Sequence, residues 1–182
     1  MVRAVTLFCG SSLGHDPRHR AAASAIGSEL ARRGIALVYG GGRIGLMGAV
    51  ADAVFAAGGR VIGVIPEFLK TAEVLHPAIP AADLVVTPTL FRRKEVMVER
   101  ADAFLTLPGG LGTLDELFEV VTLAQLRQHA KPCGLLNVAG YFDPLLEQLE
   151  RGVEAGFLER RHVERLRVDA DPVRLLDRLL RA

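Results

Sequence analysis

The chain has 182 residues and a mass of 19.6 kDa, a length that fits one domain and leaves little room for a second. Half of the residues are hydrophobic and 24% are charged, so the chain can bury a sizeable core and intrinsic disorder is excluded. The formal net charge of +1 gives no support for a broad nucleic-acid or membrane surface, so neither partner is expected.

Apolar runs of strand length alternate with longer segments of helical period, which is the pattern of a parallel sheet covered on both faces. The predicted strands are Arg3–Cys9, Ile35–Tyr39, Arg60–Ile65, Leu84–Thr87, Ala103–Leu107, Pro132–Asn137 and Leu166–Val168. The predicted helices are Pro17–Arg33, Leu46–Ala57, Leu90–Ala101, Leu114–His129, Pro144–Ala155 and Pro172–Leu180. We therefore predict one α/β domain over residues 1–182, with a mostly parallel sheet of about seven strands. A Pro-rich stretch from Lys70 to Asp83 is predicted to be an irregular excursion that could cover a site.

The targeting and redox signals point to the cytoplasm. No apolar stretch approaches the roughly 20 residues that span a bilayer. The start of the chain shows no basic-then-apolar leader, and Cys9 and Cys133 sit in or at the end of apolar runs, where a free thiol packs. Two such cysteines provide no disulfide framework, so we predict a reducing, cytoplasmic location.

Ligands in such folds bind beyond the carboxyl ends of strands, where loops lead into helix N-termini. That rule selects three small glycine-bearing loops, Cys9–Ser12, Tyr39–Gly42 and Leu107–Thr113. One such loop could be only a tight turn, but three at strand ends predict a shared floor for an anion.

The second loop continues into the spacing G-x-G-x-x-G over residues 40–45. Dinucleotide folds place this pattern in the first βα turn, whereas here it falls in the second. Two interpretations stay open and are equally supported: the glycines permit close helix–strand contact, or they contact a ligand directly.

The third loop, Pro108–Thr113, carries a stronger signal. Its glycines allow backbone amides to converge, and the following helix presents unpaired N–H groups and a positive dipole end. The sequence therefore predicts a phosphate site here. No Gly-Lys-Ser/Thr follows, so triphosphate chemistry is disfavoured.

Glu116 admits two interpretations. Thr113, Asp115 and Glu116 fit a capping box, in which Thr and Glu satisfy backbone donors reciprocally. Yet the two acids lie one helical turn from a proposed dianion, which they would repel. A site that must also stabilise a developing cation one sugar away gains from such a carboxylate. We favour that function for Glu116 and the capping interpretation for Asp115.

The basic cluster Arg92–Lys94 begins a helix, where cations oppose the dipole, so a purely structural reason for it is poor. Arg93, Met97 and Arg100 share one helical face, so not all the basic residues can point into one cleft. The five histidines show no metal-ligand spacing and are expected on the surface or in loops, so no metal site is predicted.

Three motifs together resemble the LONELY GUY family of cytokinin riboside 5′-monophosphate phosphoribohydrolases, long mislabelled as lysine decarboxylases. They are the run from Tyr39 to Gly48, the Arg93-Lys94 pair with Met97, and Pro108-Gly-Gly-x-Gly-Thr-x-x-Glu116. With Cys9–Ser12 and a likeness that continues to Gly156-Phe157, the resemblance covers nearly all but the last two dozen residues.

The resemblance implies a Rossmann-like fold, usually dimeric, that cleaves the N-glycosidic bond of cytokinin riboside 5′-monophosphates or AMP without metal or cofactor. It implies free adenine or an N6-substituted adenine and ribose 5-phosphate as products, and Arg93 and Glu116 as catalytic residues. The substrate- and phosphate-binding residues that it implies are Gly10, Ser11, Gly41, Gly42, Met47, Glu73, Lys94, Pro108, Gly109, Gly110, Gly112, Thr113 and Thr122. Phe91 and Leu123 depart from the family pattern, and both changes concern recognition of the base.

Two other functions compete with hydrolysis. A non-enzymatic nucleotide or molybdenum-cofactor carrier explains the glycines but not a carboxylate beside phosphate. Pyridoxal-phosphate decarboxylation needs a Schiff-base lysine, and Lys94 is better matched to phosphate contact.

We also predict a homodimer, because the helix that follows the third loop is apolar around most of its circumference and must be buried on both sides. Its apolar residues are Leu114, Leu117, Phe118, Val120, Val121, Leu123 and Leu126.

Overall fold

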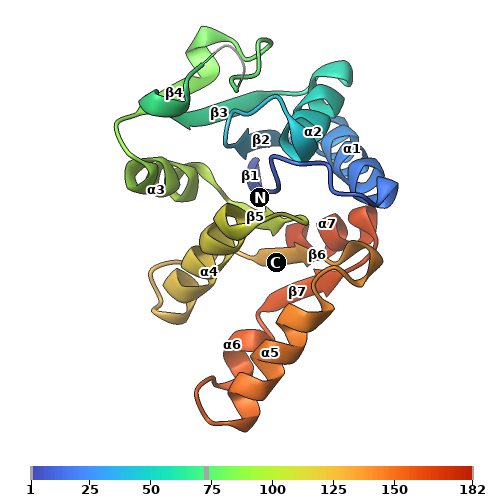
Figure 1. Ribbon diagram of the computed structural model, residues 1–182, viewed down its shortest axis with the longest axis vertical. Helices are drawn as coiled ribbons and strands as arrows, with labels where there is room; N and C mark the ends of the chain where they lie inside the picture. The colour runs from blue at the N-terminus through green and yellow to red at the C-terminus, as the bar shows by residue number, and fades with distance from the viewer. Residues whose placement is uncertain (1, 72–73, 182) are drawn as a thin grey trace.

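The computed structural model describes residues 2–71 and 74–181. It contains one seven-stranded sheet of order β4-β3-β2-β1-β5-β6-β7, in which every neighbouring pair of strands is parallel (Figure 1). The strands are β1 Ala4–Phe8, β2 Ala36–Tyr39, β3 Val61–Pro66, β4 Leu84–Thr87, β5 Ala103–Thr106, β6 Cys133–Leu136 and β7 Leu166–Asp169. All seven predicted strands are confirmed, and no strand end differs from its predicted position by more than one residue.

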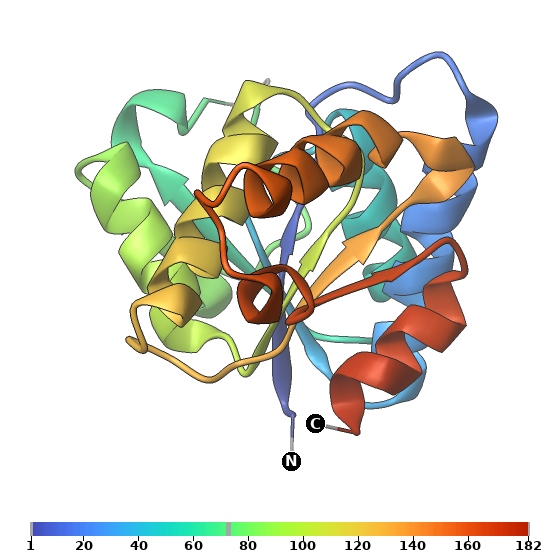
Figure 2. The ribbon, with the colours of Figure 1, turned by 90° about the horizontal axis from the view of Figure 1, so that it is seen from below.

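Helices cover both faces of the sheet (Figure 2). One apolar layer packs β1, β2 and β5 against α1 Pro17–Arg32, α2 Gly45–Ala56 and α7 Pro172–Leu180. The other packs the sheet against α3 Leu90–Arg100, α4 Leu111–Gln125 and α5 Asp143–Glu154. Because both faces are covered, central strand residues such as Val5, Leu37 and Leu105 are fully buried, which explains their continuous apolar runs.

Two differences from the predicted helices stand out. The four-residue helix α6, Arg160–Val163, was not predicted, because one turn is too short to show an apolar period. Helix α4 begins at Leu111, three residues before the predicted start. Its first turn contains Gly112, which a sequence pattern assigns to a loop although the backbone is helical.

The Pro-rich stretch follows the 3-10 helix Glu67–Leu69 and ends in a second one, Ala81–Asp83. Its other described residues are irregular, as expected. Part of it folds back on the second glycine loop: the Arg43 N–H donates to the Val74 carbonyl at 2.9 Å, and the His76 N–H donates to the Gly41 carbonyl at 2.8 Å. His76 is buried there but lies in a loop, one of the two places expected for the histidines. Within the described ranges, no helix is long and apolar enough to cross a membrane.

Candidate active site

The strand order places the candidate site at the switch between β1 and β5. These neighbours are far apart in sequence, and the chain leaves the sheet on opposite faces after them, which opens a crevice at their carboxyl ends. A cavity of about 550 Å³ lies there, lined by the β1–α1 loop, by Pro108–Gly110 and by Tyr141. Ligands of α/β sheets bind at such points.

The turns after β1 and β5 touch backbone to backbone. The Gly10 N–H donates to the Pro108 carbonyl at 3.0 Å. A Cβ on Gly109 would lie 2.1 Å from Thr113 Oγ1 and 2.8 Å from the Gly10 nitrogen. Packing within the protein therefore requires glycine at position 109, and the two turns form one rigid floor.

The N–H groups at the N-terminus of α2 are hydrogen-bonded within the protein. The N–H groups of Leu46 and Met47 donate to the Gly10 carbonyl at 3.0 and 3.3 Å. A Cβ on Gly45 would lie 2.2 Å from the Ser11 carbonyl carbon, and one on Gly48 would lie 2.0 Å from the Arg43 oxygen. Close backbone contact thus accounts for these two glycines. For Gly45, the last glycine of the G-x-G-x-x-G run, this favours the packing interpretation.

The N-terminus of α4 is different. Its first backbone hydrogen bond joins the Leu114 N–H to the Gly110 carbonyl at 3.1 Å, and the N–H groups of Leu111, Gly112 and Thr113 find no partner among the described residues. A Cβ added to Gly110 or Gly112 would meet nothing within 4 Å, and neither residue has a positive φ. Neither packing nor backbone conformation requires these two glycines. They leave an open, positively polarised helix end of the kind that binds phosphate.

The early start of α4 overturns the capping box. Gly110 is the N-cap, so Thr113 is the third helical residue and Glu116 the sixth. Both are buried, and Glu116 reaches another helix instead of the backbone of its own. Asp115 is exposed and pairs with Lys94, so the capping interpretation was wrong for that residue as well.

Glu116 forms a buried ion pair with Arg93. The Arg93 Nη2 donates to Glu116 Oε1 at 2.8 Å, and the two side chains are only 16% and 9% exposed. The guanidinium lies over the end of β2, where a Cβ on Gly40 would stand 2.5 Å from Nη2. The buried Arg93 Nε has no hydrogen-bond partner among the residues described. The pair therefore joins α3 and α4 across the end of the sheet and retains an unused donor.

Burial dominates the titration of Glu116. It raises the pKa of this carboxyl to about 7, although the charge of Arg93 acts in the opposite direction. A carboxyl that changes protonation state near neutral pH can accept a proton from water or hold a negative charge beside a cation. Perturbed groups of this kind concentrate at functional sites.

Lys94 lies beside the pair, between two acids of α4. Its Nζ is 3.0 Å from Asp115 Oδ2 and 2.7 Å from Glu119 Oε2. Burial opposes the charge of Lys94, but these two contacts outweigh burial and raise its pKa above the ordinary value. A phosphate would therefore compete with two carboxylates for this ammonium group.

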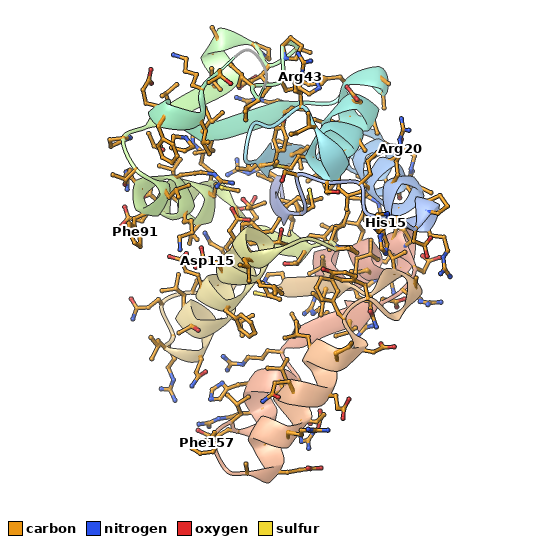
Figure 3. All side chains as sticks on the ribbon, viewed as in Figure 1. His15, Arg20, Arg43, Phe91, Asp115 and Phe157 are labelled. Atoms are coloured by element: carbon orange, nitrogen blue, oxygen red, sulfur yellow. The ribbon has the colours of Figure 1, made fainter. Side chains whose placement is uncertain are left out.

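Helices α3 and α4 face each other across a cavity of about 490 Å³ that Lys94, Phe118, Thr122 and Leu123 line. Asp115 of α4 also lines it, and the Phe91 ring of α3 lies 5.5 Å from Lys94 Nζ; Figure 3 labels both residues. This cavity lies next to the Arg93–Glu116 pair, so the two positions that depart from the family pattern, Phe91 and Leu123, both belong to this part of the molecule.

The predicted site residues fall into three neighbouring groups. Gly10, Ser11 and Pro108 to Gly110 line the crevice, with Gly112 and Thr113 following in the first turn of α4, and Lys94 and Thr122 line the α3–α4 cavity. Gly41, Gly42 and Met47 lie at the end of β2, where a Cβ on Gly42 would meet the Met47 methyl at 2.7 Å. Glu73 lies outside the described residues.

Sequence reasoning missed Tyr141. Its hydroxyl donates to the Gly109 carbonyl at 2.5 Å and so holds the loop that leads into α4 from the opposite side. A strained turn presents it: Ala139 and Gly140 have φ of 57° and 72°, and the Asn137 side-chain oxygen accepts the Phe142 N–H at 2.8 Å. No local pattern signals this contact, because its partners are 32 residues apart.

His19 was also misjudged. It was expected on the surface or in a loop, but it is buried in α1, with its ring edge-on to that of Tyr141 and the ring centroids 5.7 Å apart.

Within residues 2–71 and 74–181, no group of three or more His, Cys, Asp or Glu side chains is arranged to hold a metal ion.

Comparisons with known proteins identify the family of the chain. Residues 47–179 match the family model described as "Possible lysine decarboxylase". The chain is 47% identical over 161 residues to a cytokinin riboside 5′-monophosphate phosphoribohydrolase of Arabidopsis thaliana, with 87% of this chain and 75% of the relative covered. A probable enzyme of the same description from Oryza sativa subsp. japonica is 49% identical over 152 residues, with 84% and 71% covered.

Solved structures match the fold. The molybdenum cofactor binding protein of Rippkaea orientalis is 21% identical with a TM-score of 0.72, covering 99% of this chain and 98% of that one. The molybdenum cofactor carrier protein of Chlamydomonas reinhardtii is 22% identical with a TM-score of 0.71, and both chains are covered completely. These likenesses show the Rossmann-like architecture alone.

Fold and site together define a Rossmann-like α/β protein with a free helix N-terminus beside a buried arginine–glutamate pair. The chain belongs to the LONELY GUY family, the family of cytokinin riboside 5′-monophosphate phosphoribohydrolases whose model keeps the decarboxylase description. The family resemblance predicted from sequence is confirmed.

Glycine at position 112 is predicted to serve a ligand and not the fold. Gly112→Ala should leave thermal stability unchanged or raise it by about 0.5–1 kcal/mol, because alanine is the better helix former. It should weaken binding of ribose 5-phosphate at least about tenfold, since the added methyl group occupies the space above the free amides. Isothermal titration calorimetry and thermal melts measure the two effects.

Gly48→Ala is the matched control, because Gly48 also lies at the start of a helix but packs against the Arg43 oxygen. This variant should lose roughly 1–3 kcal/mol of stability through overpacking. If Gly112→Ala binds ribose 5-phosphate as tightly as the wild type, the phosphate is not held at this end of α4.

Proposed function

We propose that this chain hydrolyses the N-glycosidic bond of a purine nucleoside 5′-monophosphate, either AMP or a cytokinin riboside 5′-monophosphate. The proposal rests on the arrangement of polar groups in the first two turns of α4. Its first turn offers three unpaired N–H groups, and its second places the buried Glu116 carboxyl against Arg93. The named activity of the relatives supports the same chemistry.

The free amides of α4 bind the 5′-phosphate and fix the ribose beside Glu116. Binding energy from this remote phosphate then positions the scissile bond. As the bond from C1′ to the base breaks, the sugar becomes cationic, and a carboxylate beside it stabilises the developing charge, as in glycoside hydrolysis.

Water completes the reaction. Its oxygen bonds to C1′ as the bond from C1′ to the base breaks, and one of its protons passes to the Glu116 carboxylate. The departing base takes up a proton at nitrogen from solvent, and Glu116 returns its proton to solvent. The Arg93 guanidinium holds Glu116 in place. The products are the free base and ribose 5-phosphate, and no metal or organic cofactor takes part.

The competing functions receive less support. A Schiff-base lysine must lose its proton, whereas the carboxylates beside Lys94 raise its pKa and keep the ammonium charged. Cofactor carriage rests on structural neighbours at 21–22% identity, which share the fold only. A carrier would bind nucleotide without releasing base, so incubation with AMP distinguishes the two functions directly.

Glu116→Gln is predicted to lower turnover of AMP by roughly 10²- to 10⁴-fold, the range for a positioned acid–base group. The folded pKa of about 7 lies above the ordinary value of 4.5, so wild-type stability falls as pH rises from 4.5 to 7 and the buried carboxyl ionises. Glutamine carries no such charge, and the variant should melt at the same temperature as the wild type or higher above pH 7. A variant that keeps wild-type turnover contradicts the assignment.

The pH dependence provides a second readout of the same variant. Because the ionised carboxylate is the active form, kcat/KM of the wild type should rise through pH 7 and level off above it. The phosphate of AMP titrates nearby, with a pKa of about 6, and that limb should persist in Glu116→Gln. If the variant loses only the change in kcat/KM near pH 7, that change belongs to the titration of Glu116.

We further propose that the active unit is a homodimer packed around α4. Leu117 and Val120 of this helix are buried in the core, whereas Leu111, Phe118 and Leu126 are 87%, 42% and 61% exposed. Such large apolar side chains on the helix that holds the site fit coverage by a second copy.

Phe118→Asp should yield a monomer by light scattering at micromolar concentration, because a carboxylate would be buried in the interface. Phe157→Asp is the control: Phe157 is 88% exposed but lies beyond α5, away from Asp115 in α4 (Figure 3). A wild-type protein that is monomeric under these conditions would refute the dimer.

A further inference from the structure

A third cavity lies at the opposite edge of the sheet from the candidate site. It has a volume of about 770 Å³ and sits where β6 and β7 begin, below the C-terminal end of α4. Its volume is that of a small-molecule site. Four cationic side chains line it, Arg127, Lys131, Arg165 and Arg167, and we call this cavity the basic pocket.

The protein balances little of the charge of the basic pocket: Lys131 acts electrostatically on the Asp102 carboxylate, but the two form no ion pair in the described residues. Glu164 is the one acid among the lining residues, and in the described parts of the chain none of the four cations pairs with a carboxylate. Elsewhere such pairs are the rule, as for Arg33 with Asp177 at 2.7 Å and Arg174 with Asp169 at 2.6 Å. A protein with a net charge of +1 therefore concentrates uncompensated positive charge at one cavity.

Helix ends account for only part of this arrangement. Lys131 Nζ donates to the Val98 carbonyl of α3 at 2.7 Å, and Arg165 Nη1 donates to the Ala124 carbonyl of α4 at 3.2 Å. Arg167 donates to the Arg178 carbonyl of α7. Each contact uses one donor of a group that has three or five, and a helix end offers about half a charge against a full one.

Arg127 is held in a conformation that suits glycine. It follows α4 with a φ of 60°, and the N–H groups of Arg127 and Gln128 donate to the Ala124 and Leu123 carbonyls at 3.1 and 2.9 Å. Glycine is the usual residue at this position of a helix C-terminus. Neither backbone geometry nor a protein partner explains an exposed arginine there, whereas an anion in the pocket does.

The rest of the lining is neutral. His129 Nε2 donates to the Val120 carbonyl at 2.9 Å, and its Nδ1 accepts the Lys131 N–H at 3.2 Å, so both ring nitrogens are occupied. Burial lowers the pKa of His129 and raises that of the Cys133 thiol to about 12, so both stay uncharged at neutral pH. The cations thus determine which ligand the cavity favours.

We propose that the basic pocket is a second ligand site, which binds a small anion carrying two or more phosphate charges. Guanidinium groups suit phosphoryl oxygens because their donors are fixed in a planar fork, and several of those donors remain unused here. The proposal does not depend on the proposed hydrolase activity, because it concerns the other end of α4.

Inorganic pyrophosphate is the probe that tests it. Calorimetric titration in saturating ribose 5-phosphate, which occupies the site at the start of α4, should still show one bound pyrophosphate per chain. Arg165→Ala with Arg167→Ala should weaken this binding at least about tenfold. Arg20→Ala is the matched control, an exposed arginine on α1 without a carboxylate partner among the described residues, and it should bind as the wild type does (Figure 3).

Arg127→Gly separates a ligand role from a structural one. Relief of the left-handed backbone should raise the melting temperature, while loss of the cation should weaken pyrophosphate binding. Pyrophosphate affinity that is unchanged in both the double variant and Arg127→Gly overturns the proposal, as does a wild type that binds none at millimolar concentration. If ribose 5-phosphate does not bind, the start of α4 stays open and two pyrophosphates should bind per chain. The pyrophosphate that the double variant loses is then the one bound in the basic pocket.

Discussion

The site depends on one constraint, the close approach of the turns after β1 and β5. The Gly10 N–H bonds the Pro108 carbonyl, and no Cβ fits at Gly109 between Thr113 and Gly10. This contact fixes where α4 begins and which way its first amides point. The Tyr141 hydroxyl secures the same loop through the Gly109 carbonyl. An anion-binding helix end is useful only if it is rigid, because a site that must be ordered on binding loses affinity.

In the proposed mechanism, one helix performs two tasks that conflict electrostatically. A phosphate at the start of α4 is attracted by the free amides, yet Glu116 lies only one turn further on. Arg93 reconciles the two by neutralising the carboxylate from α3 at 2.8 Å. Burying such a pair costs more in desolvation than it gains in attraction, so stability does not explain its presence. The cost is understandable at a reaction centre, where function is often maintained at the expense of stability.

The sequence was sufficient for the parts that local pattern determines. Apolar periodicity located the strands and the six longer helices, and glycine after β1 and β5 located the floor of the crevice. It was insufficient where a residue's role depends on distant partners. Thr113 to Glu116 has the spacing of a capping box, but Gly110 begins the helix, and Glu116 is drawn to Arg93, 23 residues away. The G-x-G-x-x-G run could be interpreted only when the Gly10 carbonyl was seen to close the start of α2. Tyr141 and the two acids beside Lys94 left no local signal at all.

The ratio of kcat/KM for AMP to that for adenosine tests the central claim most directly, because the two substrates differ only in the phosphate that the free amides of α4 are proposed to hold. Three charge-assisted hydrogen bonds predict a preference for AMP of roughly 10³-fold or more. Adenine and ribose 5-phosphate should appear in equal amounts from AMP. Comparable kcat/KM values for AMP and adenosine would contradict the account.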